Sequence, residues 1–302
     1  MPVWMPFGRV RGVARATRLL AARAQNNVRK RLVRRVLRRQ TPPDHRRAES
    51  DFEVLQGRYG PRPEYGYDSL STWRRGARRA ERLLGLASVK EPGKEVLEAC
   101  CGDGMLGVAL ASYGHNVILL DLRDWRDVRA QRLPFVRADL CDSTPLQYSV
   151  FDLVCSFNAL EHLPDPDRAL RNMISLCRPG GHVYLEFGPL HASPWGLHAY
   201  GTIRMPYPQF LFSPSFLQKK LETFGIYDLG EKQSALQPLN GWRPRQFCAL
   251  WEQSGCRVIS QTSVNDESHL DLVLEYPEAF AGRGLSLEDI MTEALTVAMQ
   301  RD

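Results

Sequence analysis

The 302-residue sequence predicts a doubly wound α/β fold built on a mostly parallel, seven-stranded sheet. Two observations lead to this prediction. Apolar runs alternate with helical patterns from residue 94 onward, and such runs suit parallel strands that are covered on both faces. A glycine-rich turn, "CCGDGMLG" at 100–107, follows the first of these strands. Ligands of open α/β sheets bind at the carboxyl ends of the strands, where this turn would lie.

The predicted elements follow in order along the chain. Strands are expected at 94–99, 116–121, 134–140, 151–157, 182–187 and 256–264, with a last one near 295–299, where apolar and polar residues alternate. Helices are expected at about 68–86, 104–114, 165–177 and 243–255, the third of them stopped by "RPGG". Residues 270–277 fit either a strand or a helix.

Residues 189–215 interrupt this alternation with five prolines and five aromatic side chains. A long irregular segment after a strand is usually a lid or a binding loop. The expected organisation is therefore a basic arm over 1–47, a linker and covering helix over 48–92, and a main domain over 93–302 with an insert at about 189–240. Residues 41–50 are interpreted as a linker because of their prolines and polar side chains.

The charge is divided unevenly along the chain. Residues 1–47 hold 14 basic residues and one acid, a net +13, whereas the remainder holds 26 basic and 33 acidic residues, a net −7. Residues 9–40 contain no acid and no proline. Their apolar residues recur at spacings of three and four, which predicts one apolar stripe on an arginine-covered helix. The stripe consists of Val10, Val13, Ala16, Leu20, Ala24, Val28, Leu32 and Val36.

Such a helix suits an anionic membrane surface, where each basic side chain contributes about 1 kcal/mol. Three other interpretations stay open: a solvated helix or partly disordered tail, a contact with nucleic-acid phosphates or an acidic partner, and a mitochondrial-type presequence. The acidic body argues against a nucleic-acid substrate and for a small-molecule or lipid-linked one.

The seven cysteines form no C-x-x-C pair, so reduced thiols in a cytosolic-type compartment are expected, and no zinc site. No apolar run approaches the roughly 20 residues that span a bilayer, and the N-terminus lacks a secretory h-region. A cytoplasmic location is predicted, at a membrane periphery if the arm binds one.

The glycine turn fits two patterns. "GDGMLG" matches the dinucleotide fingerprint G-x-G-x-x-G, with Asp121 following Gly102 by 19 residues. That pattern usually has its first glycine at the strand end, whereas here the strand is expected to end at Glu98. The ordered segments "VLEACCGDG", "LLD", "RADL", "FDLVCSFNALEHLPDP" and "LCRPGGHVYLE" instead resemble the class I S-adenosylmethionine-dependent methyltransferases over about 94–188.

The resemblance implies a Rossmann-like sheet with S-adenosylmethionine bound at the glycine turn. Glu98 would hold the cofactor's ammonium group or order the loop around it. Gly102 and Gly104 would let the backbone approach the ligand and open a helix toward it. Cys100 departs from the family, which usually has glycine there; we expect the turn to persist with a negative φ and slightly weaker binding.

The resemblance also implies four further cofactor contacts. Asp121 would accept hydrogen bonds from both ribose hydroxyls. Asp139 would lie near the adenine amino group with Leu140 against the ring, and Asn158 would reach the cofactor through its backbone or amide.

Methyl transfer from a sulfonium requires in-line alignment of the nucleophile. A hydroxyl acceptor would also benefit from a general base, for which His162, His191 and His198 are candidates. Glu161 with His162 could bind a metal as in some relatives, but no metal site is predicted. The aromatic insert suggests an apolar or flat acceptor, or a sugar, and methylation on oxygen. Two alternatives are a cofactor-binding scaffold protein and an NAD-type oxidoreductase.

Overall fold

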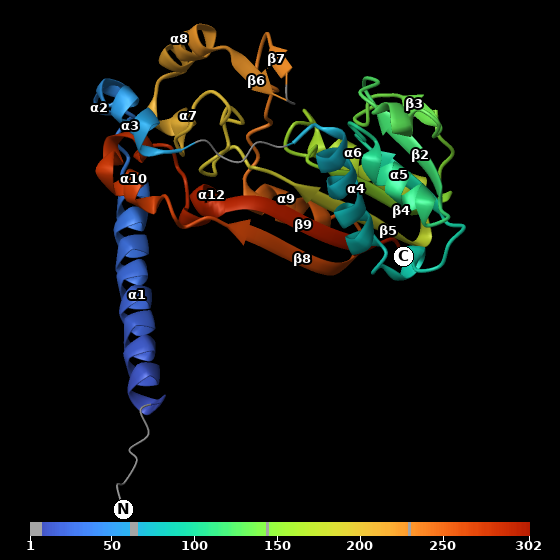
Figure 1. Ribbon diagram of the computed structural model, residues 1–302, viewed down its shortest axis with the longest axis horizontal. Helices are drawn as coiled ribbons and strands as arrows, with labels where there is room; N and C mark the ends of the chain where they lie inside the picture. Colours follow the sequence, from blue (N-terminus) through green and yellow to red (C-terminus); the bar gives the residue numbers. More distant parts are fainter. Residues whose placement is uncertain (1–7, 61–65, 143–144, 229–230) are drawn as a thin grey trace, which may run out of the picture.

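The computed structural model describes residues 8–60, 66–142, 145–228 and 231–302, and thus not the first seven residues of the arm (Figure 1). Within these residues the chain forms a seven-stranded sheet in the order β3-β2-β1-β4-β5-β9-β8. β9 runs antiparallel to both its neighbours, and the pairs from β3 to β5 are parallel. The predicted fold class is confirmed.

The strand bounds follow the sequence pattern closely at the centre of the sheet. The strands are β1 Glu95–Ala99, β2 Asn116–Asp121, β3 Phe135–Arg137, β4 Phe151–Phe157, β5 Cys177–Phe187, β8 Arg257–Asn265 and β9 Thr292–Gln300. The bounds of β2 and β4 are those predicted.

Two predicted bounds were wrong, one because of a local turn and one because of a long-range contact. β3 ends at Arg137 because the next residues turn, with the Asp139 carboxylate accepting a hydrogen bond from Cys141 N at 2.8 Å. "RPGG", predicted to be a helix stop outside the sheet, lies in β5. Gly180 N donates to Arg301 O at 2.7 Å, so the end of the chain holds this segment against the sheet.

Helices cover both faces of the sheet. α4 (Ser69–Leu83) and α5 (Met105–Ser112) pack on one face, and α6 (Pro166–Leu176) and α9 (Pro244–Glu252) pack on the other. α4 and α5 approach closely at Gly76, where an added Cβ would lie 2.4 Å from Met105 O. These helices leave the carboxyl edge of the parallel strands to other segments.

A third core lies at one end of the sheet, and we call the residues around it, 33–58, 189–233 and 266–291, the cap. It includes α2 Arg46–Ser50, α3 Phe52–Arg58, α7 Pro208–Leu211, α8 Pro214–Phe224, the pair β6 Ile226–Asp228 and β7 Glu231–Gln233, α10 Leu270–Glu275, α11 Pro277–Phe280 and α12 Leu287–Met291. The cap gathers at the left of Figure 1. The linker prediction for 41–50 was wrong over its second half, because Ala48 of α2 is buried in this core.

The arm is helical, as predicted: α1 spans Gly8–Leu37 and extends away from the cap (Figure 1). The single apolar stripe was wrong over the part whose side chains are described. Val36 is buried in the cap, but Val28 and Leu32 are 55% and 41% exposed. Residues spaced by four drift by about 40° around a helix per step, so the stripe winds from one face to another. No helix among the described residues is both long and apolar enough to cross a bilayer.

Candidate functional site

The glycine turn between β1 and α5 is held in a left-handed conformation. Cys100, Gly102 and Gly104 have φ values of 55°, 53° and 67°. The predicted negative φ at Cys100 was wrong. A backbone hydrogen bond from Cys101 N to Leu120 O and a bond from Gly102 N to the Asp121 carboxylate fix the turn on β2, with Cys100 in the left-handed region. A side chain in this region costs about 1–2 kcal/mol.

The two glycines of the turn serve different purposes. A Cβ added at Gly102 would meet no atom within 4 Å, so its backbone borders open space that a ligand can occupy. A Cβ at Gly104 would lie 2.8 Å from Leu119 Cδ1 and 3.0 Å from Ala130 Cβ. Gly102 is therefore the ligand-facing glycine, and Gly104 allows the turn to pack against the sheet.

Glu98 lies under the turn and does not face the open side. Its carboxylate is 3% exposed and accepts a hydrogen bond from Gly107 N, the first turn of α5, at 2.7 Å. An added Cβ at Gly107 would lie 3.0 Å from that oxygen. Burial raises the pKa of Glu98 to about 8. Of the two roles predicted for Glu98, this geometry supports the ordering of the loop.

The other predicted cofactor residues follow the ends of β2, β3 and β4. Asp121 is half-buried and its Oδ2 accepts from Gly102 N at 2.9 Å; burial raises its pKa. Asp139 is half-buried beside the buried Leu140. Asn158 is exposed, with a φ of 51° and its backbone N donating to Glu186 O. Two carboxylates, an apolar side chain and an open glycine backbone suit an adenosyl group at this edge.

Two of the three candidate bases meet where the cap joins the sheet. The rings of His162 and His198 lie edge to face with centroids 4.9 Å apart. His162 Nδ1 is 2.8 Å from Pro238 O, and His198 Nε2 is 2.7 Å from Pro189 O. A carbonyl oxygen only accepts, so these nitrogens carry the hydrogens. His162 Nε2 and His198 Nδ1 are then left with lone pairs.

Glu161 completes this cluster. Its side chain is 2% exposed, and its Oε1 accepts from Gly188 N at 3.0 Å and lies 4.0 Å from His162 Nε2. Its Oε2 has no hydrogen-bond partner among the described residues, and burial raises its pKa. One ligand atom each from Glu161, His162 and His198 lie within 4.8 Å of one another. This donor set could hold a small divalent cation, which the sequence spacing did not predict.

His191, the third candidate base, lies apart from this cluster. Its ring packs edge-on against Phe210 at 6.2 Å inside the cap, and burial lowers its pKa. Sequence reasoning missed Asn240, which fastens the end of the insert to the loop after β4. Asn240 Nδ2 donates to Leu160 O at 2.7 Å and to Leu163 O at 3.0 Å. No local pattern marks such an asparagine.

Comparison with known proteins identifies similar chains. A family model described as a methyltransferase domain matches residues 72–261. The ubiquinone biosynthesis O-methyltransferase of Vibrio parahaemolyticus is 31% identical over 102 residues, 31% of this chain and 43% of that protein. That of Cronobacter sakazakii is 30% identical over 131 residues, 41% of this chain and 52% of that protein. The chain spans about half the length of these curated relatives.

Solved structures are more distant. A putative S-adenosylmethionine-dependent methyltransferase from Listeria monocytogenes is 13% identical, with a TM-score of 0.46 over 75% of this chain and 98% of that one. Phosphoethanolamine N-methyltransferase 2 of Haemonchus contortus, in complex with S-adenosyl-L-methionine, is 14% identical, with a TM-score of 0.46 over 84% of this chain and 56% of that one.

Proposed function

The chain belongs to the methyltransferase-domain family and is a class I S-adenosylmethionine-dependent methyltransferase, and on this premise we propose that it methylates a hydroxyl group. The acceptor is a small molecule, a sugar or a lipid-linked molecule. The observation that supports oxygen as the acceptor atom is the pairing of His162 with His198 at the end of β4. The family assignment replaces the dinucleotide interpretation of the glycine turn.

S-adenosylmethionine, when bound, supplies a methyl group on a positively charged sulfur. The protein has to orient the acceptor hydroxyl and remove its proton. A hydroxyl is a poor nucleophile until it loses that proton, and a positioned base contributes about 10²–10⁴-fold to such a reaction. His162 suits this role because its Nδ1–H is held by Pro238 O, which leaves Nε2 as the basic nitrogen.

Glu161 supports His162 as a positioning residue. The carboxylate lies 4.0 Å from His162 Nε2 and is anchored by Gly188 N. A buried carboxylate at this distance favours the imidazolium that forms when the acceptor proton arrives. His198, in a loop of the insert, packs edge to face against the His162 ring, and one of its ring nitrogens lies within 4.8 Å of both Glu161 and His162. The base and the groups around it thus come from both the sheet and the cap.

The chemistry of the cap supports an acceptor with apolar or aromatic surface. Trp195 and Tyr200 lie edge to face with ring centroids 6.5 Å apart, and Tyr200 lies 6.5 Å from the His198 ring. Aromatic rings beside a base suit a flat or sugar-like hydroxyl compound. The names of the curated relatives, O-methyltransferases, agree with oxygen as the acceptor, although those matches cover only 102 to 131 residues.

The test compares His162→Gln with His191→Gln, a matched change at a cap histidine outside the cluster. Turnover is measured with labelled S-adenosylmethionine on a panel of phenols, sugars and prenylated phenols, and cofactor affinity by calorimetry. We expect His162→Gln to lower turnover by about 10²–10⁴-fold with unchanged cofactor affinity. His191→Gln should stay within a few-fold of wild type.

Full turnover in His162→Gln would contradict a base at this position. Methylation of carboxylates but not hydroxyls would contradict the acceptor class, because a carboxylate needs no base. Loss of activity on dialysis against EDTA, restored by Mg²⁺, would assign the cluster to a cation instead. Cofactor binding without methyl transfer to any acceptor in extracts of its own cells would support the scaffold alternative.

A further inference from the structure

We propose that α1 and the pocket beside its C-terminal end bind the phosphate headgroups of an anionic phospholipid bilayer. The inference stands apart from the acceptor chemistry proposed above, since it rests on residues of the arm and of the far end of the sheet. It names one occupant, an anionic lipid surface, for a helix and a pocket that the methyl-transfer site does not use.

The arm is fixed to the body by its C-terminal third. Val33, Val36 and Leu37 are buried in the cap core. Lys30 Nζ lies 2.5 Å from Glu267 Oε1, and Arg29 Nη1 lies 3.3 Å from an Asp271 carboxylate oxygen. The helix is therefore held in one direction and extends from the cap, as Figure 1 shows.

The other arginines of α1 whose side chains are described, and the two that directly follow it, do not hold the arm to the body through ion pairs. Six exposed arginines form no ion pair with any residue that the structure describes: Arg23, Arg31, Arg34, Arg35, Arg38 and Arg39. The sequence adds four more along the helix, at positions 9, 11, 15 and 18, and no acid. A guanidinium without a carboxylate partner is available for phosphate, which it binds through paired N–H donors.

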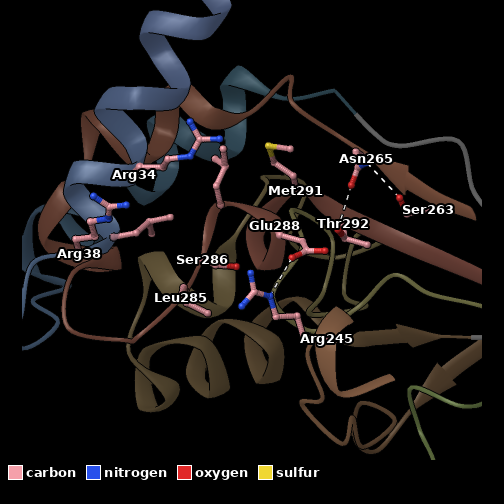
Figure 2. A pocket seen from close by; sticks show the side chains of 12 residues that line it. Arg34, Arg38, Arg245, Ser263, Asn265, Leu285, Ser286, Glu288, Met291 and Thr292 are labelled. Carbon is pink, nitrogen blue, oxygen red and sulfur yellow. Dashed lines mark hydrogen bonds and ion pairs between the residues drawn. The ribbon is translucent and has the colours of Figure 1, made fainter. Parts of the chain in front are cut away.

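A pocket of about 470 Å³ lies beside the C-terminal end of α1, where Arg34 and Arg38 line it. In Figure 2, Arg34 and Arg38 extend from α1 on one side, and Arg245 of α9 approaches Glu288 on the other. The lining thus has three arginines and a single acid, which is already 3.4 Å from Arg245. The remaining lining is apolar or neutral: Leu37, Ser263, Asn265, Leu285, Ser286, Leu287, Met291 and Thr292.

This combination favours a lipid over a nucleic acid. The pocket places four apolar side chains beside its arginines, which suits a phosphodiester that continues into a glycerol and acyl chains. On the arm, Val28 and Leu32 are 55% and 41% exposed between the free arginines. Apolar side chains that enter the acyl boundary add to the attraction of basic ones for anionic headgroups. The phosphate backbone of a nucleic acid has no apolar region into which these apolar side chains could insert.

The pocket lies at the carboxyl edge of the parallel strands. β8 runs parallel to β5, because both are antiparallel to β9. Asn265 at the end of β8 and Thr292 at the start of β9 therefore lie at the same edge of the sheet as Asp121 and Asn158. A bilayer held against α1 and the pocket would therefore approach the carboxyl edge that also carries the proposed methyl-transfer site, but at the β8 end of that edge, with four strands between β8 and β2.

The experiment uses the full chain and sedimentation with vesicles of phosphatidylcholine, alone or with phosphatidylglycerol as three lipids in ten. Wild type should bind the anionic vesicles and not the neutral ones. Arg34→Glu/Arg38→Glu should weaken binding by at least about tenfold, because each basic residue contributes about 1 kcal/mol at such a surface. The matched control is Arg74→Glu/Arg78→Glu, two exposed arginines with the same spacing on α4, which should stay within about twofold.

A second variant tests the pocket without a change of charge. Ser263→Trp places a large side chain in the pocket and should weaken binding to the anionic vesicles, while cofactor affinity by calorimetry stays unchanged. Equal sedimentation of wild type and Arg34→Glu/Arg38→Glu would overturn the proposal. So would a Ser263→Trp protein that binds the anionic vesicles as tightly as wild type. It would also be overturned if the protein bound inorganic phosphate but no vesicle, or bound duplex DNA at physiological salt more tightly than the anionic vesicles.

Discussion

The sheet domain and the cap are both well packed, but they are assembled differently. The two cores of the sheet domain lie on its two faces, and each contains residues of β1, β2, β4, β5 and β9 together with the helices that cover that face. The cap core joins Val36 and Phe52 to Phe212, more than 150 residues away, and to Phe280. The cores of the sheet domain are organised by regular strand pairing, whereas the cap core brings together three segments that are distant in the chain.

This difference separates the two halves of the reaction. The predicted cofactor residues Glu98, Gly102 and Asp121 lie at or just after the ends of β1 and β2. The groups that surround His162 belong to the insert, through Pro238 and His198. A local sequence pattern therefore predicts the cofactor side of the proposed site, whereas its acceptor side depends on how the insert packs against the loop after β4.

The largest expected effect concerns the carboxyl group of Glu98, which is buried in the sheet domain. Burial raises the pKa of Glu98 from 4.5 to about 8, so the folded state binds a proton that the unfolded state releases. The stability is then fully present below pH 4.5 and is lost as the pH rises through about 8, by an amount on the order of 5 kcal/mol. Glu98→Gln should remove this part of the pH dependence of the free energy of unfolding, measured in urea from pH 5 to 9.

Glu95→Gln on the same strand is the control, since Glu95 is only half-buried and accepts from Asn116 Nδ2. It should keep the wild-type pH profile. A Glu98→Gln profile parallel to that of wild type would show that Glu98 is ionised in the folded protein.

The second prediction compares the two kinds of core directly. Phe52 packs against Phe212 and Phe216 at ring distances of 5.2 and 5.4 Å in the cap, and Phe151 is 2% exposed in the sheet core. Changing either residue to Ala should lower the free energy of unfolding by about 3–5 kcal/mol. We expect Phe52→Ala to raise hydrogen exchange in cap peptides while cofactor affinity stays near wild type. Phe151→Ala should lower both the stability of the sheet and cofactor affinity.

Loss of cofactor affinity in a folded Phe52→Ala protein would mean that the cap and the sheet form one cooperative unit. Hydrogen exchange followed by mass spectrometry, with calorimetry on the same samples, distinguishes the two outcomes.

The smallest expected effect concerns backbone strain in the glycine turn. Cys100 has a φ of 55°, which costs about 1–2 kcal/mol for a residue with a Cβ. Cys100→Gly relieves that strain, and the added freedom of the unfolded chain takes back about 0.4–1 kcal/mol. A net gain of up to about 1 kcal/mol is expected in urea unfolding. Cys100→Ala keeps the Cβ and should show no gain; equal stabilisation by both would assign the effect to the thiol.

The sequence by itself determined the sheet and the residues at its strand ends. Apolar runs marked β2 and β4 to the residue, and the acid closing β2 was correctly placed beside the glycine turn, where Asp121 holds Gly102. Strand bounds depend on which residues are buried, and the turn after β1 involves only a few consecutive residues. Such local features are visible in the sequence as apolar runs and as a glycine turn.

Only the tertiary structure decided the φ of Cys100, the helix at 270–275, the buried α2 and the pairing of His162 with His198. Each depends on atoms far away in the chain: β2 for the turn, the cap core for α2 and α10, and the insert for the histidines. The tertiary structure also decided which face of α1 is exposed to solvent, because the burial of Val33, Val36 and Leu37 in the cap fixes the orientation of the helix. At these positions the local sequence leaves several conformations nearly equal in free energy, and long-range packing determines which one forms. A local sequence pattern therefore does not predict it.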